Sequence, residues 1–217
     1  MTSLILIRHG ETDWNLQGRF QGQIDVPLNA TGLAQAQRLA QRLAEEPVDV
    51  MLCSDLLRTQ QTAAPLAARL GLTPQLQPLW REQHFGVLEG LDVPAIRAQY
   101  PDLWAQWTRH ESGFALPGGA ESNQAFHARV MQALQDLLAR HAGQRVVVVT
   151  HGGVLDMLWR TVRQLPLDGP RTCDIPNTGI NRLRWDGGRL HIEHWADAAH
   201  LSGLPTQPGT SQAAKGR

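Results

Sequence analysis

The sequence predicts an α/β fold, with a doubly wound and mostly parallel sheet that is flanked by helices. Residues 4–7 and 146–149 are apolar throughout, which is typical of strands buried on both faces of a parallel sheet. Segments with apolar residues at helical spacing separate the expected strands. Because 42% of the 217 residues are hydrophobic, the chain can bury one sizeable core, and we expect a single domain over residues 1–202.

The first part of the chain is expected to alternate between strands and helices. Gly, Gln and Asn are frequent after the first strand, which indicates a loop. Thr31 is the expected N-cap of the first long helix, and Gly71 is expected to end the second. The expected elements are a loop, a helix, a strand, a helix and a short strand: residues 10–30, Thr31–Glu46, Val48–Cys53, Leu56–Leu70 and Leu76–Leu79.

Residues 92–120 have a different composition from the rest of the chain. Prolines interrupt short helical stretches here, and four aromatic residues are concentrated in them: Tyr100, Trp104, Trp107 and Phe114. We expect this segment to be an inserted cap over one end of the sheet. Its aromatic side chains either form a partly apolar wall for a substrate or fill a small core of their own.

The second half of the chain returns to alternating elements. Ser122 is expected to cap a long helix, and Asp186-Gly187-Gly188 predicts a hairpin between the last two strands. The expected elements are a helix, a strand, a helix and two strands: Ser122–His141, residues 146–149, Val154–Arg163, Ile180–Trp185 and Arg189–Trp195. Residues 203–217 are rich in Gly, Pro, Ser and Gln, which indicates a disordered tail.

The charge and the cysteine content exclude several classes of function. With 20 basic and 20 acidic residues the formal net charge is zero, so we expect no general binding of nucleic acid or of a membrane surface. The only lysine is Lys215, which excludes a catalytic lysine in the core. Cys53 and Cys173 have no metal-like spacing, and no segment resembles a signal peptide or a transmembrane helix. We therefore expect a soluble, cytoplasmic protein.

Polar residues follow the predicted strands at the points where these strands end. Arg8 and His9 follow the first strand, Arg58 the second, Glu82 the short third strand, and His151 the strand at 146–149. Because the carboxyl ends of parallel strands lie at one edge of a sheet, we expect these side chains to converge. Hydrolysis of a phosphate monoester requires the removal of on the order of 20 kcal/mol from the barrier, so several preorganised cations are needed. The two arginines should also lower the pKa of His9 and keep it neutral for attack.

The motifs around these residues resemble the histidine phosphatase superfamily, the phosphoglycerate-mutase-like group, from Leu4 to about Leu201. They occur in the order and at the spacings of that family. The matching motifs are Arg8-His9-Gly10-Glu11-Thr12-x-x-Asn15, Gln21-Gly22, Asp25-x-Pro27-Leu28, Ser54-Asp55-Leu56-x-Arg58-x-x-x-Thr62-Ala63, Glu82-x-x-Phe85-Gly86-x-x-Glu89-Gly90, Gly118 to Ser122, and Thr150-His151-Gly152-Gly153. The resemblance implies the three-layer sandwich of that group. Ala120 departs from the commoner Gly-Gly-Glu-Ser form, which leaves the role of Glu121 open.

The resemblance also implies a role for each residue of the constellation. His9 would be the nucleophile that becomes phosphohistidine, and Glu82 the general acid and later the base. Arg8, Arg58 and His151 would hold the phosphoryl oxygens. Further contacts with the substrate are expected from four residues: Asn15, Gln21, Gly22 and Gly152.

Neither a metal nor a cofactor is expected for this chemistry. No His-Glu-x-x-His motif occurs, and His191, Glu193 and His194 read as the polar face of the last strand. His84, two residues after Glu82, either touches the leaving group or has a structural role.

The expected activity is hydrolysis of a small phosphorylated metabolite, a phosphomonoester, through phospho-His9. Phosphoglycerate mutase is the alternative, but family members with that activity carry further basic residues in the inserted segment, where this chain has only Arg97 and Arg109. A non-catalytic module that binds a phosphorylated ligand is the third hypothesis, although the full set of site residues favours an enzyme. The sequence leaves the substrate open among sugar phosphates, aryl phosphates and nucleotide-like groups, and the oligomeric state open between a monomer and a homodimer.

Overall fold

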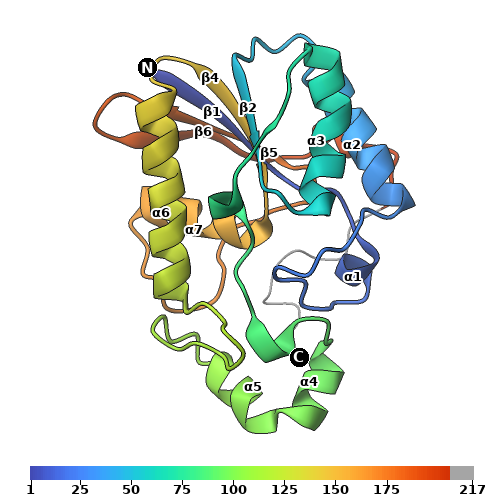
Figure 1. The fold of residues 1–217 in the computed structure, drawn as a ribbon, viewed down its shortest axis with the longest axis vertical. Coiled ribbons are helices and arrows are strands. Elements are labelled where there is room, and N and C mark those ends of the chain that lie inside the picture. Colours follow the sequence, from blue (N-terminus) through green and yellow to red (C-terminus); the bar gives the residue numbers. More distant parts are fainter. Residues whose placement is uncertain (206–217) are drawn as a thin grey trace.

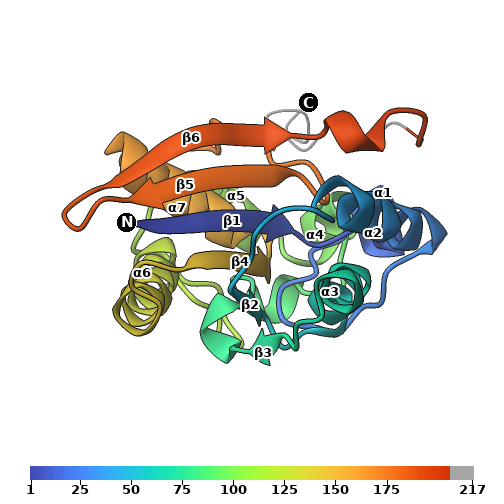
Figure 2. The same cartoon turned by 90° about the horizontal axis from the view of Figure 1, so that it is seen from above.

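The protein is built as three layers, with a central sheet between two pairs of helices (Figures 1 and 2). The computed structural model describes residues 1–205, so residues 206–217 of the predicted tail lie outside the described part. The arrangement confirms the predicted α/β fold with a mostly parallel sheet.

The sheet has six strands in the order β3-β2-β4-β1-β5-β6. β1, β2, β3 and β4 run parallel to one another, whereas β5 pairs antiparallel with β1 and with β6. The strands are β1 Thr2–Arg8, β2 Val50–Cys53, β3 Gln75–Leu76, β4 Arg145–Thr150, β5 Ile180–Trp185 and β6 Leu190–Asp197. The predicted hairpin is confirmed, but the predicted strand Leu76–Leu79 is shorter, because Pro78–Trp80 forms a 3-10 turn.

Alternate residues of the strands face different helices, as expected for a sheet covered on both sides. Leu4 and Leu6 of β1 contact α6 (Asn123–Arg140) and α7 (Gly152–Arg163), and Ile5 and Ile7 contact α2 (Ala30–Arg42) and α3 (Leu57–Leu70). Each helix therefore buries its apolar stripe against one face of the sheet. The carboxyl ends of β1, β2 and β4 lie at one edge of the sheet, so the residues that follow these strands are brought together there.

The helix caps confirm two predictions and correct a third. Ser122 caps α6 through a hydrogen bond from the Ala125 N–H, and Gly71 ends α3 in the left-handed region at φ +67°. Thr31, however, is not the N-cap of α2. Asn29 takes that place because its side chain accepts from the Gly32 N–H at 2.8 Å.

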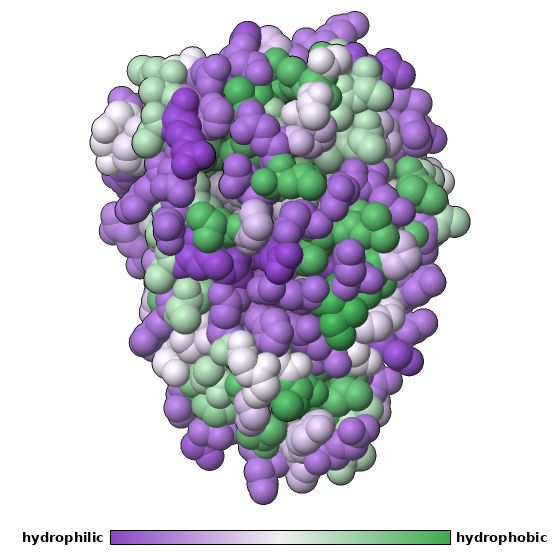
Figure 3. Space-filling model, viewed as in Figure 1, coloured by the Kyte–Doolittle hydropathy of each residue, from purple (hydrophilic) through white to green (hydrophobic). Residues whose placement is uncertain are grey.

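Residues 86–120 form a separate lobe beneath the carboxyl edge of the sheet (Figure 1). Its short helices are the 3-10 turn Gly86–Leu88, α4 Val93–Gln99 and α5 Pro101–Trp107. They enclose a cluster of their own around Leu88, Ile96 and Leu116. On the face seen in Figure 3, hydrophilic residues predominate between this lobe and the sheet.

Two further short helices lie outside the layers. α1 (Asp13–Leu16) interrupts the predicted loop 10–30 with a single turn, which Thr12 caps in a capping box with Asn15. The 3-10 turn Ala199–Leu201 follows β6. No helix of the described chain is both long and apolar enough to cross a membrane.

Candidate active site

A cleft of about 520 Å³ opens at the carboxyl edge of the sheet, between the sheet and the cap. Eight of the nine predicted site residues line it: Arg8, His9, Asn15, Gln21, Gly22, Arg58, Glu82 and Gly152. They come from β1, the loop after it, α3, the turn before the cap, and the start of α7. The predicted convergence of the strand ends is therefore what the fold produces.

The orientation of His9 leaves one ring nitrogen free on the cleft side. Its Nδ1 donates a hydrogen bond to the Gly10 carbonyl oxygen at 2.7 Å, so Nε2 carries the lone pair. The pKa of His9 is lowered well below 6.5, first by burial and then by the charges of Arg58 and Arg8. The two arginines thus act in the expected direction, but burial is the larger cause.

Arg8 and Arg58 are buried cations held by backbone carbonyl groups. Arg8 Nη1 donates to the Ile175 carbonyl at 2.7 Å, and Arg58 donates to the Ile24 and Gly22 carbonyls at 2.9 and 2.7 Å. Burial lowers the pKa of each guanidinium to about 10, so both remain charged at neutral pH. The Nε of each is buried without a hydrogen-bond partner among residues 1–205. Both groups therefore retain donors for an anion.

His151 lies behind His9 and does not line the cleft. It is fully buried, and the two ring centroids are 5.3 Å apart. Its Nε2 lies 2.9 Å from Ser54 Oγ, while its Nδ1 has no hydrogen-bond partner in the described chain. Burial, followed by the charge of Arg58, lowers its pKa well below 6.5. The fold thus places the uncharged imidazole of His151, a predicted site residue, next to that of His9.

Glu82 is held at the N-terminus of α7. Its carboxylate accepts from the Gly153 N–H at 3.1 and 3.0 Å, and from the Gln83 N–H at 2.9 Å. A Cβ at position 153 would lie 2.2 Å from Glu82 Oε1, so the approach of the carboxylate requires glycine there. The helix end therefore fixes both the position and the orientation of this group.

Asn15 and Gln21 meet at the hydroxyl group of Thr12. Thr12 Oγ1 lies 3.2 Å from Asn15 Oδ1 and 3.0 Å from Gln21 Oε1. Because both side chains direct their oxygens toward Thr12, their amide groups remain as donors at the cleft.

Glu121 and His84, whose roles the sequence left open, both make structural contacts. Glu121 forms a two-pronged ion pair with Arg129 at 2.6 Å for both contacts. Arg129 in turn donates to the carbonyl groups of Leu79, Arg81 and Glu82. His84 Nδ1 accepts from the Gly86 N–H at 3.1 Å. The ion pair thus braces the segment that carries Glu82.

Sequence reasoning missed three residues that the fold brings to the site. Ser54 is the partner of His151, and Asn177 donates to the His9 carbonyl oxygen at 2.9 Å. Arg171 lines the cleft next to Arg8 and contributes to the lowered pKa of that group. Ser54 follows a strand, so its position gave a usable signal. Arg171 and Asn177 lie in an irregular segment, where no periodicity indicates their direction.

The aromatic residues of the cap serve both of the suggested purposes. Trp104 and Trp107 line the cleft and also pack in the cap cluster, to which Tyr100 and Phe114 belong. Arg19 and Arg97 line the same cleft. The entrance therefore combines aromatic surface with positive charge.

Within residues 1–205, no group of His, Cys, Asp or Glu side chains is arranged to hold a metal ion. His191 pairs with Asp186 and Glu193 with Arg184, on the exposed side of the terminal hairpin. Cys53 and Cys173 are both buried and unpaired. Burial raises the pKa of each thiol to about 12, so neither is a nucleophile at neutral pH.

The fold and the cleft together define a phosphoglycerate-mutase-like α/β enzyme with a positively charged site around a neutral histidine. The chain belongs to the histidine phosphatase superfamily (branch 1), whose family model matches residues 4–198. It is an enzyme of that superfamily, a phosphoric monoester hydrolase.

Named relatives agree with this assignment. The chain is 36% identical over 201 residues to phosphoglycerate mutase-like protein 4 of Arabidopsis thaliana, covering 91% of this chain and 86% of that protein. It is 34% identical over 206 residues to the metal-independent phosphoserine phosphatase of the same plant, covering 94% and 85%. The solved structure of Bacillus stearothermophilus YhfR superposes with a TM-score of 0.84 at 30% identity, covering 93% of this chain and 100% of that one.

Proposed function

We propose that this enzyme hydrolyses small phosphorylated metabolites in two steps, through a phosphohistidine at His9. The observation that carries the proposal is the state of His9 at the base of the cleft. Its Nδ1 is committed to the Gly10 carbonyl, and its pKa is lowered. The free Nε2 is therefore an unprotonated nucleophile at neutral pH, next to two permanently charged arginines.

In the first step, Nε2 of His9 forms a bond to phosphorus as the ester P–O bond breaks. Arg8 and Arg58 hold the phosphoryl oxygens through the donors that have no partner within the described chain. His151 adds a hydrogen bond from Nδ1, with Ser54 as the donor to its Nε2. Asn15, Gln21 and the Gly152 N–H at the start of α7 complete the cradle.

Glu82 supplies the proton that the leaving alkoxide needs. In the second step it takes a proton from water, which attacks phosphorus as the P–Nε2 bond breaks. The hydrogen bonds from Gly153 and Gln83 hold its carboxylate at the cleft for both tasks. The second step regenerates neutral His9 and releases inorganic phosphate.

Mutase activity is the alternative, in which the phosphoryl group returns to the substrate rather than to water. The inserted segment carries only Arg97 and Arg109 as basic residues, and this favours hydrolysis. Incubation with 3-phosphoglycerate and a trace of bisphosphoglycerate separates the two. We expect release of phosphate, whereas rapid isomerisation without release would exclude our proposal.

The nucleophile is tested by the change His9→Ala. We expect loss of turnover and of an acid-labile phosphoenzyme, both measured with a 32P-labelled phosphomonoester. The matched control is His127→Ala, which alters a histidine on α6 that does not line the cleft. An H9A variant that still released phosphate at the normal rate would refute the assignment.

A further inference from the structure

Glu89 is a nearly buried carboxylate that the proposed mechanism does not use. It directly follows the 3-10 turn Gly86–Leu88, and its side chain is only 8% exposed. A carboxylate that is withdrawn from water has to be matched by hydrogen-bond donors. Two backbone N–H groups donate to its Oε1, that of Gln23 at 3.0 Å and that of Phe85 at 2.9 Å. One oxygen atom therefore joins the loop after β1 to the segment that follows Glu82.

The loop that is bound in this way, residues 20–24, supplies the acceptors that hold Arg58. The guanidinium group donates to the carbonyl groups of Gly22 and Ile24 at 2.7 and 2.9 Å. Gln21, whose amide group is a proposed phosphate ligand, lies in the same loop. Movement of this loop would therefore displace a guanidinium group and an amide group of the cradle together.

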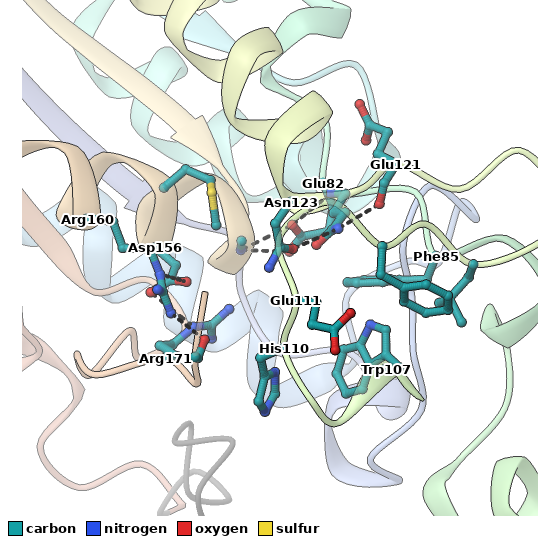
Figure 4. Close-up of a pocket in the computed structure, with 16 residues that line it drawn as sticks. Glu82, Phe85, Trp107, His110, Glu111, Glu121, Asn123, Asp156, Arg160 and Arg171 are labelled. Atoms are coloured by element: carbon teal, nitrogen blue, oxygen red, sulfur yellow. Dashed lines mark hydrogen bonds and ion pairs between the residues drawn. The ribbon is translucent and has the colours of Figure 1, made fainter. Parts of the chain in front are cut away.

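The other segment that Glu89 binds carries Glu82. Gln23 Nε2 donates to the Glu82 carbonyl at 3.2 Å, so the loop and the segment are also tied directly. Figure 4 shows the side chains of Glu82 and Phe85 at a chamber of about 70 Å³, and the same two residues line the cleft itself. The position of this segment therefore decides where the carboxylate of Glu82 stands relative to a phosphoryl group in the cleft.

Glu89 approaches the loop so closely that glycine is required at position 22. A Cβ there would lie 1.8 Å from Glu89 Oε1, and Gly22 has φ +50°, in the left-handed region. Backbone hydrogen bonds flank the contact. The Phe20 N–H donates to the Leu91 carbonyl at 3.0 Å, and the Phe20 carbonyl accepts from the Gly90 N–H at 2.8 Å. Both segments therefore hold the carboxylate in one place.

We propose that Glu89 is a positioning residue that sets the placement of Arg58 relative to Glu82. By holding the loop 20–24 against the segment that carries Glu82, it aligns a phosphate-binding guanidinium group with the proton donor. The role belongs to the oxygen that accepts two N–H groups, and not to the negative charge. This inference rests on the proposed phosphatase activity and adds a residue that does not touch the substrate.

The charge of Glu89 has a minor effect on Arg58. Burial lowers the pKa of Arg58 to about 10, and the charges of Glu82, Asp25 and Glu89 oppose this shift, with Glu89 contributing least of the three. Arg58 therefore stays protonated at neutral pH without it. His84 Nε2 lies 4.0 Å from Glu89 Oε1, which is beyond hydrogen-bond distance.

The test separates position from charge with two substitutions of similar size. Glu89→Leu removes the acceptor, whereas Glu89→Gln keeps a carbonyl oxygen that can accept from both N–H groups. For E89L we expect kcat/KM for an aryl phosphate at pH 7 to fall about 100-fold, the effect of a misplacement of about 1 Å. The inhibition constant of inorganic phosphate should rise about tenfold, because Arg58 moves with the loop. E89Q should keep both values within about threefold.

The acidic limb of the kcat/KM profile distinguishes positioning from a loss of stability, because it reports the pKa of His9. Burial and then the charges of Arg58 and Arg8 lower that pKa. Displacement of Arg58 in E89L should therefore move the limb to higher pH, whereas E89Q should leave it in place. A variant that is merely less stable would keep the limb at its wild-type position.

Glu46→Leu is the matched control. This glutamate forms an ion pair with Arg182 near the start of β1, and it does not line the cleft. Its replacement should change neither the inhibition constant of phosphate nor the acidic limb. Thermal unfolding of both leucine variants shows whether each is folded at the assay temperature.

Two results would overturn the inference. Wild-type kcat/KM and phosphate inhibition in E89L would show that the loop and the segment keep their places without Glu89. Equal losses in E89L and E89Q would assign the role to the charge. In both cases the phosphatase proposal survives, since it fails only if His9→Ala retains turnover.

A second variant keeps the inference testable if E89L does not fold. Gly22→Ala disturbs the same contact from the loop, because the added Cβ would displace the Glu89 carboxylate. Its control is Gly18→Ala, which introduces a similar backbone strain at φ +67° but has no atom within 4 Å of the added Cβ. We expect weaker phosphate inhibition and the shifted limb in G22A alone. Equal behaviour of the two alanine variants would contradict the proposal.

Discussion

At the scale of single residues, the site must place an uncharged histidine among cations that attract a dianion. Burial solves this problem for His9 and His151, because a buried imidazole resists protonation, and the adjacent guanidinium groups act in the same direction. The cations that we propose as the phosphoryl ligands thus also keep the proposed nucleophile unprotonated.

This arrangement predicts the acidic side of the pH–rate profile. Protonation of His9 removes the attacking lone pair, so kcat/KM should fall only at pH values well below 6.5, where the lowered pKa lies. Arg58→Met should move this acidic limb to higher pH, because it removes the charge with the largest lowering effect on the pKa of His9.

The measurement is kcat/KM for an aryl phosphate between pH 4 and pH 8 in both proteins. Arg163→Met serves as the control, since it removes an arginine far from His9 and should leave the limb in place. A wild-type limb centred at or above pH 6.5 would contradict the assignment of His9.

At the scale of elements, the start of α7 organises much of the site. A Cβ at Gly152 would lie 3.5 Å from both Arg8 Nε and Arg171 Nη1, and the Gly153 N–H donates to Glu82. Arg160, two turns later, donates to carbonyl groups of the segment before Arg171. One helix, α7, therefore positions the proposed phosphoryl cradle, Glu82 and the segment that carries Arg171.

Gly153→Ala is expected to displace Glu82 while leaving the helix intact. The added Cβ would lie 2.2 Å from Glu82 Oε1, so the carboxylate must move away from its hydrogen bonds. We expect kcat to fall about 100-fold or more, as for loss of a general acid. The free energy of unfolding should change by only about 1 kcal/mol, because alanine favours the helix whereas its Cβ would lie only 3.0 Å from Cε1 of the buried Phe126.

Steady-state kinetics and thermal unfolding of G153A test both parts of this expectation. Gly113→Ala is the control, since a Cβ there makes only an ordinary 3.8 Å contact with Gln124. Normal activity in G153A would show that Glu82 does not need its place at the helix end.

At the scale of the whole molecule, the buried histidines link stability to pH. Their pKa values are lowered in the folded protein, so below about pH 6.5 the unfolded chain binds more protons than the folded one. The free energy of unfolding should then decrease with falling pH by about 1.4 kcal/mol per unit for each histidine. Above pH 6.5 this contribution is constant.

Urea unfolding at pH 7.5, 6 and 5 measures this slope. His9 and His151 together contribute part of this pH dependence of the free energy of unfolding, and His9→Gln and His151→Gln should each remove about half of that contribution. Carboxylates such as Asp55, whose pKa is lowered from 3.8 by Arg81, lose their contribution only at more acidic pH and do not confuse the result. Slopes unchanged in both variants would show that the two rings are not the linked groups.

Much of the fold and of the site could be predicted from the sequence. Uninterrupted apolar runs gave the buried strands, and the residues after them formed the site, because parallel strands end at one edge. The strand order was not predictable, since β4 inserts between β2 and β1 through contacts distant in sequence. Arg171 and the Asn29 cap escaped prediction for a related reason, because irregular segments carry no period that fixes the direction of a side chain.

The separate cluster of Leu88, Ile96 and Leu116 has a consequence for how this enzyme can change over time. Most residues of this cluster belong to the cap, and Phe20 joins them from the loop after β1, whereas the reacting groups stand on the sheet and its helices. Substitutions in the cap can therefore alter which molecules enter without weakening the frame that performs the chemistry. A lineage with this architecture can acquire new substrates in small steps and keep a working enzyme at each one.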